Sequence, residues 1–403
     1  MDSLLEKFSK LGCDNAPGQE GRQKAAVLDL RGEKLEGRLV DFSHGDVDAH
    51  PPIPGTLSDF VTGVEKIGGH QAYTEYRGNG GIRGELAQKI SAFTGSAIDP
   101  DQNIILTPGT QGALFLAVGA NMVAGDKVAI VEPDYFANRK LVEFFGGEMV
   151  PVQMDYENAQ DCAGLDLTQL EKAFQDGAKL FLFSNPNNPT GVVYSAGTLE
   201  RMADILRAKE KEYGTAIVLI SDEPYRELAY DGVEVPYVTG FYDDTVICYS
   251  YSKSLSLPGE RIGYLVIPDE LQDSKEVFNA ATIANRVMGC VNAPSLMQRV
   301  IKRCIDEQVN LEAYDKNRNL LYNGLKDLGF VCIKPQGAFY LFVKSPEADE
   351  KKFCEACKKH NVLVVPGSSF ACPGYVRISY CVSYGQIERS LPAFAKIAAE
   401  YGL

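Results

Sequence analysis

The apolar residues of this chain gather into short runs that alternate with longer amphipathic segments. Five such runs are residues 127–133, 179–186, 216–224, 245–253 and 261–268. Because Val, Ile, Leu and Phe occur there without strict polar alternation, the runs are typical of strands buried on both faces of a mainly parallel sheet. The segment AGTLERMADILRAKEKEY (196–213) lies between two of them and is amphipathic, as a crossover helix should be. We therefore predict an α/β fold centred on roughly residues 50–285.

The last third of the chain has a different pattern. Residues 293–327 have a helical pattern, whereas FVCIKP (330–335) and AFYLFV (338–343) have strand patterns. VRISYCVS (376–383) is predicted to form another strand before a closing helix. This succession indicates a smaller α+β domain. We assign residues 46–288 to the large domain, and residues 1–45 with 289–403 to the small one.

Composition and charge narrow the class of protein. The 403 residues are 45% hydrophobic and 23% charged, which is ordinary for a globular protein with a large core. The formal net charge is −14 and no long basic run occurs, which argues against nucleic acid as a partner and favours a small molecule. We see neither a signal peptide nor a run of some twenty apolar residues, so we expect a cytoplasmic protein without a membrane span.

The cysteines do not resemble the dense disulfide framework of a small secreted domain, because all ten are scattered between Cys13 and Cys381. One CxxC pair, Cys354 and Cys357, is followed by His360. Neither a second pair nor a fourth ligand is visible nearby, and the spacing of three residues also places these side chains on one helical face. We expect no metal site.

Polar segments follow three of the apolar runs, at the points where strands are predicted to end. They are SNPNNPTG (184–191), SDEPY (221–225) and SYSK (250–253). Ligands bind beyond the carboxyl ends of strands in an open parallel sheet, so the amide of Asn188, the carboxylate of Asp222, the phenol of Tyr225 and the amine of Lys253 are expected to converge. Taken singly, such residues also build turns, cap helices or lie in solvent.

In this order and spacing, SNPNNPTG, DEPY and SYSKSLSLPGERIGY resemble the class I/II aminotransferases of pyridoxal-phosphate fold type I. Aspartate aminotransferase is the best-known member of that family, and the resemblance covers nearly the whole chain. It implies a large domain with a mainly parallel seven-stranded sheet between helices, a smaller α+β domain, and pyridoxal 5′-phosphate as the cofactor.

Pyridoxal phosphate needs a lysine for its Schiff base and an acidic partner for its pyridine nitrogen. Lys253 and Asp222 fit these two roles. By resemblance, Asn188 and Tyr225 hydrogen-bond the phenolic oxygen of the cofactor ring. Lys253, Asp222 and Tyr225 are thus the candidate catalytic residues, and Lys253 is also the expected general base at the substrate Cα.

The cofactor phosphate needs fixed hydrogen-bond donors. LTPGTQGALFLAVG (106–119) changes from a strand pattern to a helical pattern, so free backbone amides and the helix dipole can face an anion there. Hydroxyls and a guanidinium from the lysine segment can be added, and arginine suits bidentate phosphate contact. By resemblance, the phosphate-binding residues are Gly109, Thr110, Gln111, Ser250, Ser252 and Arg261.

Two tyrosines complete the expected cofactor site. Tyr135, in VEPDYFANRK (131–140), stands where the family has an aromatic residue stacked on the cofactor ring. AYTEYRGNGGIRGELAQKI (72–90) resembles the YTxxxGxxxLR segment of the family, in which Tyr73 reaches the phosphate of the other subunit. The resemblance therefore implies a homodimer with active sites at the interface. The same segment is not a dinucleotide-binding fingerprint, because Arg83 stands where the third glycine is required.

An arginine is the main residue expected to bind the substrate. GYVRISY (374–380) presents Arg377 on a strand pattern, and a buried arginine requires an anionic partner. By resemblance Arg377 binds the substrate α-carboxylate, together with Asn188 and the backbone of Gly45. Arg286 lies near the distal-carboxylate arginine of one aspartate aminotransferase subgroup, although the spacing to the next Asn differs by one. A solvated helix arginine is the alternative at that position.

We predict an aminotransferase that exchanges an amino group between an acidic or neutral L-amino acid and a 2-oxo acid such as 2-oxoglutarate. A lyase of the same fold, such as a C–S β-lyase, shares every cofactor contact, so these contacts cannot separate the two activities. A cofactor-binding regulator or silent scaffold fits less well. Regulators carry an added DNA-binding domain, for which the N-terminal stretch is too short, and the set Lys253, Asp222 and Arg377 is intact.

Overall fold

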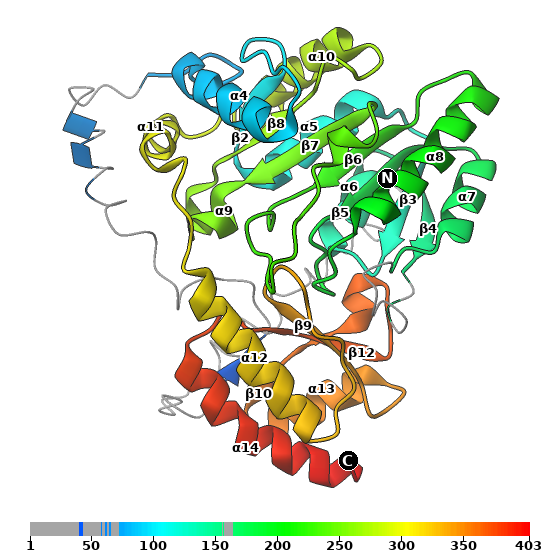
Figure 1. The fold of residues 1–403 in the computed structure, drawn as a ribbon, viewed down its shortest axis with the longest axis vertical. Helices are drawn as coiled ribbons and strands as arrows, with labels where there is room; N and C mark the ends of the chain where they lie inside the picture. The colour runs from blue at the N-terminus through cyan, green and yellow to red at the C-terminus, as the bar shows by residue number, and fades with distance from the viewer. Residues whose placement is uncertain are drawn as a thin grey trace, which may run out of the picture.

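A seven-stranded sheet, called here the large sheet, lies in the upper part of Figure 1. The computed structural model describes residues 40–42, 58, 61–62, 64–65, 72–154, 156 and 164–403. In order across the sheet, the strands are β2 (Ile104–Thr107), β8 (Gly263–Val266), β7 (Thr245–Ser250), β6 (Val218–Asp222), β5 (Ala178–Ser184), β3 (Lys127–Glu132) and β4 (Glu148–Gln153). Strand β8 is antiparallel to both of its neighbours, and the remaining pairs are parallel. The predicted α/β fold with a mainly parallel sheet of seven strands is confirmed.

Helices cover both faces of the large sheet, because its strands send buried side chains alternately into two cores. In β3, Val128 and Ile130 pack in one core, while Ala129 and Val131 pack in the other. This double burial explains why the strand sequences are apolar without alternation. The helices against the first core are α5 (Gly109–Asn121) and α10 (Ser274–Val287), and those against the second are α4 (Gly80–Thr94), α7 (Leu167–Gln175) and α8 (Ala196–Tyr213).

The helix predicted at residues 196–213 forms as α8 with the same bounds. Ser195 caps its first turn, because its hydroxyl accepts a hydrogen bond from the backbone N–H of Thr198 at 3.2 Å. Gly214 ends the helix with a φ of 68°, a left-handed conformation that a residue without Cβ adopts with no steric penalty. Local capping chemistry therefore sets both ends of this crossover.

A smaller part lies below the large sheet in Figure 1 and has a core of its own. It holds a three-stranded antiparallel sheet, called here the small sheet, in the order β11-β12-β9, and a parallel pair of β1 with β10. Helices α12 and α14 lie side by side in this part. The elements are β1 (Val40–Asp41), α12 (Leu311–Asp327), β9 (Tyr340–Lys344), α13 (Glu350–Lys359), β10 (Val362–Leu363), β11 (Val365–Pro366), β12 (Tyr375–Ser379) and α14 (Tyr384–Tyr401).

The remaining described helices are α6 (Phe136–Phe144), α9 (Tyr251–Ser254) and α11 (Ser295–Cys304), with 3-10 turns η2 (Val238–Gly240), η3 (Pro258–Glu260) and η4 (Gly367–Phe370). Met297 and Val300 of α11 pack in a core of the large sheet. The domain boundary after residue 288 stays a prediction. No described helix combines the length and the hydropathy that crossing a bilayer requires.

One strand prediction is wrong. FVCIKP (330–335) forms no strand, and within it Cys332 makes a single antiparallel bridge to Val343 of β9. Pro335 has no backbone N–H, so the segment cannot continue a ladder of hydrogen bonds at its end. Strand β9 is instead paired along its length with β12.

Candidate active site

The polar strand ends predicted from the sequence lie together at one edge of the large sheet. Because β5, β6 and β7 are parallel and in register, Ser184 pairs with Asp222, and Asp222 pairs with Cys248 of β7. Contacts join this edge to the small sheet: Asn188 Oδ1 accepts from Arg377 Nη1 at 3.0 Å, and the Tyr225 and Tyr340 hydroxyls are 2.8 Å apart. The site is therefore built between the two sheets.

Asp222 is buried, with 4% of its surface exposed, at the end of β6. Burial and the nearby Asp134 raise the pKa of its carboxyl to about 8. Its Oδ2 accepts from the Ser184 hydroxyl at 3.3 Å, whereas Oδ1 has no hydrogen-bond partner among the described residues. A buried carboxylate oxygen without a donor fits a protonated ring nitrogen, which would supply both the missing hydrogen and the opposite charge.

Lys253 follows β7 in the one-turn helix α9. The Ser250 hydroxyl caps this turn by accepting from the backbone N–H of Ser252 at 3.3 Å. This cap fixes the backbone conformation from which the Lys253 side chain extends. The Lys253 ammonium lies 5.3 Å from the centroid of the Phe339 ring, and that ring packs edge-on against Tyr225. The amine is thus in the same pocket region as the predicted ring-oxygen partner Tyr225.

The predicted phosphate cradle lies at the start of α5. Gly109 begins this helix with a φ of 72°, and a Cβ on it would lie 2.5 Å from Nη2 of Arg261. Thr110 Oγ1 is buried and has no hydrogen-bond partner among the described residues. A helix N-terminus, an orphaned hydroxyl and a guanidinium together form a donor set that fits a phosphate. Ser250 and Ser252 are buried, while Gln111 is exposed.

Tyr135 lies at the N-terminus of α6, directly after β3, and is half-buried. Burial and the nearby Asp222 carboxyl raise the pKa of its phenol. The aromatic ring predicted to stack on the cofactor therefore lies beside the carboxylate predicted to meet the ring nitrogen.

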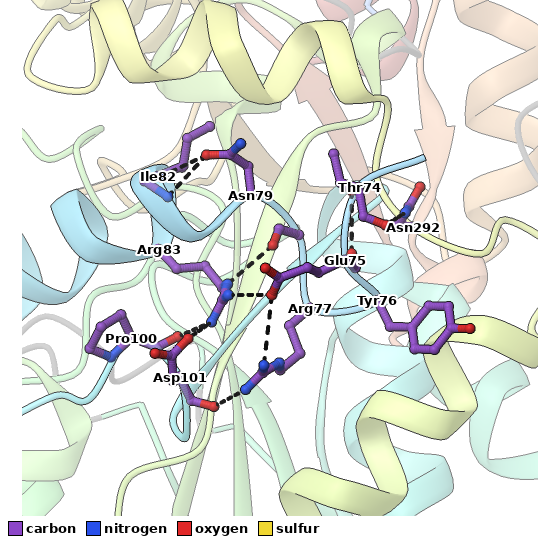
Figure 2. Close-up of polar contacts among 12 residues, drawn as sticks. Thr74, Glu75, Tyr76, Arg77, Asn79, Ile82, Arg83, Pro100, Asp101 and Asn292 are labelled. Carbon is purple, nitrogen blue, oxygen red and sulfur yellow. Dashed lines mark hydrogen bonds and ion pairs between the residues drawn. The ribbon is translucent and has the colours of Figure 1, made fainter. Parts of the chain in front are cut away.

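Tyr73 lies before α4 and is 86% exposed. Figure 2 shows how the segment that carries it is anchored: Arg83, 1% exposed, lies between the carboxylates of Glu75 at 2.8 Å and Asp101 at 2.6 Å. Arg83 also donates to the carbonyl of Gly78 at 3.2 Å. Two anions satisfy this buried cation, so the loop before α4 is held in one conformation. The predicted contact of Tyr73 with a second subunit stays a prediction.

Arg377 is 7% exposed on β12 and is enclosed by aromatic rings. Its guanidinium carbon lies 4.4 Å from the ring centroid of Tyr340 and 4.8 Å from that of Phe370. Both distances are within the range of a cation–π contact, which holds the guanidinium plane in place. Arg377 thus lies inward, as predicted, beside Asn188. Gly45, the other predicted carboxylate contact, lies outside the described residues.

Arg286 is exposed on α10. It donates a hydrogen bond to the Tyr76 hydroxyl, and its guanidinium carbon lies 4.6 Å from the centroid of that ring. Together with Tyr73 it lines a surface cavity of about 750 Å³. The structure therefore groups Arg286 with Tyr73 and not with Arg377, and its predicted role in specificity stays a prediction.

Three residues of this region were missed by the sequence reasoning: Asp134, Ser184 and Tyr340. Asp134 and Ser184 lie just beyond or at the ends of β3 and β5, so the same strand-end rule would have selected them. Tyr340 had a weaker signal, a phenol inside the apolar run of β9. Its contact with Tyr225 joins segments 115 residues apart, which no local pattern encodes.

The two cysteines of the CxxC pair are part of the hydrophobic core. Cys354 and Cys357 are buried in α13, and burial raises the pKa of the Cys354 thiol to about 12. His360 is hydrogen-bonded to Glu400 at 2.8 Å. The described part of the chain contains no group of three or more His, Cys, Asp or Glu side chains arranged to hold a metal ion.

Comparison with known proteins adds four findings. The family model described as aminotransferase class I and II matches residues 40–394. A probable aspartate aminotransferase of Methanocaldococcus jannaschii is 32% identical, over 80% of this chain and 85% of that protein. The crystal structure of an aminotransferase from Eubacterium rectale is 38% identical, with a TM-score of 0.90 over 99% of both chains. An aspartate aminotransferase from Rhodobacter sphaeroides is 40% identical, with a TM-score of 0.80 over 91% of this chain and 92% of that one.

Proposed function

The chain belongs to the class I and II aminotransferase family and is an aminotransferase, and from that premise we propose its cofactor, its site residues and its substrates. It uses pyridoxal 5′-phosphate to move an amino group between an L-amino acid and a 2-oxo acid such as 2-oxoglutarate. The observation that carries this proposal is the buried Asp222, whose Oδ1 has no hydrogen-bond partner among the described residues, at the strand edge that also holds Lys253.

Asp222 and Lys253 are the two residues that bind the reactive part of the cofactor. The Lys253 amine would hold the cofactor covalently, and the carboxylate of Asp222 would face its ring nitrogen. Asn188 and Tyr225 donate to the phenolic ring oxygen, and Tyr135 stacks on the ring. When bound, pyridoxal phosphate supplies an electron sink for the pair left behind when the substrate Cα–H bond breaks.

The start of α5 and the lysine segment hold the phosphate. The positive φ of Gly109 and its lack of a Cβ allow the Arg261 guanidinium to lie against its backbone. The buried Thr110 hydroxyl gains a partner when the phosphate binds. The full set is Gly109, Thr110, Gln111, Ser250, Ser252 and Arg261, with Tyr73 contributed by a second subunit.

Lys253 moves the proton of the reaction. Its amine would be the general base that takes the proton from the substrate Cα and the acid that returns it. The surrounding side chains of Tyr225 and Phe339 are buried, which limits the access of water to this proton.

Arg377 and Asn188 bind the substrate α-carboxylate, with the backbone of Gly45. The Tyr340 and Phe370 rings beside the guanidinium hold it in the orientation needed for two parallel hydrogen bonds to a carboxylate. Relatives described as aspartate aminotransferases suggest an acidic substrate, and Arg286 is the proposed partner of a distal carboxylate. Because Arg286 lines the same surface cavity as Tyr73, it would reach the site of the second subunit.

A homodimer is part of this proposal. The exposed Tyr76 lines the same cavity as Tyr73 and Arg286, and α10, which carries Arg286, also exposes Ile283 and Val287. Such a surface suits a second copy of the chain whose active site Tyr73 completes. A cytoplasmic location is the prediction made from the sequence.

The test is a panel of L-amino acids offered with 2-oxoglutarate and pyridoxal phosphate, with separate measurement of glutamate and ammonia. Glutamate formation that depends on Lys253, and that Lys253→Ala abolishes, is the expected result. Ammonia with a 2-oxo acid and no glutamate would identify the lyase alternative instead. Lys316→Ala is the control, because that side chain is exposed and lies outside the proposed site.

A further inference from the structure

A second buried carboxyl lies behind the proposed ring-nitrogen partner. Asp134, directly after β3 and Pro133, has no exposed surface, and Asp222 is 4% exposed. The hydroxyl of Ser184 lies between them, 2.8 Å from Asp134 Oδ1 and 3.3 Å from Asp222 Oδ2. Two acids and one hydroxyl therefore form a continuous buried chain.

Counting hydrogens in this chain indicates an additional proton. The Ser184 hydroxyl has one hydrogen, so it can donate to one of the two carboxyl groups at a time. If both carboxyls were ionised, the Ser184 oxygen and the second carboxylate oxygen would be in contact without a hydrogen between them. Two like charges would also lie close together in a buried site. One proton shared by the two acids satisfies both contacts, because the protonated acid then donates to the Ser184 oxygen.

The contacts also indicate which acid holds the proton in the protein without cofactor. Asp134 accepts from Ser184 at 2.8 Å and from the Asn138 amide at 2.8 Å, so its negative charge is well solvated by donors. Asp222 has the longer contact with Ser184, and its Oδ1 has no hydrogen-bond partner among the described residues. Asp134 is therefore the ionised member and Asp222 the neutral one.

Titratable side chains of several elements surround the pair. The titratable side chains that face it from the neighbouring elements are Glu132, Tyr135, Tyr194, Tyr225 and Cys248. The charge of Glu132 is itself paired with Arg139 at 2.9 Å. Burial raises the pKa of Asp134 to about 7 and that of Asp222 to about 8, which agrees with retention of a proton near neutral pH.

We propose that Asp134 is a positioning residue that shares one proton with Asp222 through Ser184 and takes this proton when the cofactor binds. The Asp222 O–H bond breaks as its proton passes to the Ser184 oxygen, and the original Ser184 hydrogen passes to Asp134. The protonated ring nitrogen keeps its own proton and meets an ionised Asp222. The pair has one negative charge before and after binding. This inference rests on the proposed role of Asp222.

The experiment is calorimetry of pyridoxal phosphate binding to the apoenzyme in buffers of different ionisation enthalpy, which counts the protons exchanged. The lysine and the cofactor contribute the same protons in every variant, so differences between variants report on the pair. In the wild type the proton moves to Asp134 and is retained. In Asp134→Asn it has no acceptor, so we expect this variant to release up to about one more proton per site than the wild type between about pH 5.5 and 8.

Ser184→Ala is the second variant; it keeps both acids, so we expect a proton count near the wild-type value, because the equilibrium count depends on the two carboxyls and not on the hydroxyl between them. Glu132→Gln is the matched control, a neighbouring carboxyl outside the Ser184 chain, with the wild-type proton count. Equal proton counts for wild type and Asp134→Asn across this pH range, with the cofactor bound in both, would overturn proton sharing. Failure of the wild type to bind pyridoxal phosphate would instead overturn the proposed function.

Discussion

Tyr340 allows the two halves of the site to be tested separately, because its ring and its hydroxyl contact different residues. It is 2% exposed on β9. The ring lies 4.4 Å from the Arg377 guanidinium carbon, and the hydroxyl lies 2.8 Å from that of Tyr225. Removing the hydroxyl should therefore affect the cofactor side, whereas removing the ring should affect the binding of the substrate carboxylate.

The magnitudes follow from the type of each contact. A desolvated cation–π contact is worth about 1–2 kcal/mol, so Tyr340→Leu should raise KM for the amino acid by about 5- to 30-fold. Tyr340→Phe keeps the ring and should leave KM within about threefold of the wild type. It leaves the Tyr225 hydroxyl without its partner, so the apoenzyme should lose about 1 kcal/mol of unfolding free energy. The Tyr225 hydroxyl is the proposed partner of the cofactor ring oxygen, so the pH dependence of the cofactor absorbance should also shift.

The assay is steady-state transamination, read as kcat and KM, with a pH titration of the visible cofactor band. Tyr230→Phe is the matched control, because it removes another buried phenol hydroxyl, one that donates to the Ala338 carbonyl at 2.6 Å. The reasoning is refuted if Tyr340→Phe raises KM as much as Tyr340→Leu does, or if Tyr230→Phe shifts the cofactor band equally.

Three further predictions concern the phosphate, the loop before α4 and specificity. Gly109→Ala should weaken pyridoxal phosphate binding by at least about tenfold, since its Cβ would displace the Arg261 guanidinium; unchanged affinity in an absorbance titration would contradict this. Arg83→Met should lower the unfolding free energy by about 2 kcal/mol, because the Gly78 and Pro100 carbonyls lose a charged donor; a denaturant titration without that loss would contradict the anchoring role. Arg286→Ala should raise KM for aspartate and glutamate but not for alanine, and an equal loss for all three donors would exclude a role in specificity.

Much of the large sheet and its ligand edge could be predicted, because the relevant signals are local. The unbroken apolar runs, the caps of α8 and the polar residues after each strand are all readable over a few neighbouring positions. Register then brings Ser184, Asp222 and Cys248 together, since parallel strands end at the same edge. The sequence alone was therefore sufficient to select Asp222 and Lys253 as residues of one candidate site.

The parts that were missed depend on packing between distant segments. Tyr340 becomes a site residue because the small sheet lies against the strand ends, and Arg83 becomes an anchor because residues 75 and 101 converge on it. FVCIKP has a strand-like composition, yet it makes only one isolated bridge, to the edge of β9 that β12 leaves open.

The most direct test of the central claim is to locate the cofactor on the chain. The purified protein is loaded with pyridoxal phosphate, reduced with borohydride to fix the Schiff base, digested, and analysed by peptide mass spectrometry. The account predicts one modified lysine per chain, Lys253, in the peptide that follows β7. Stoichiometric modification of a different lysine, or none in a protein that still transaminates, would contradict it.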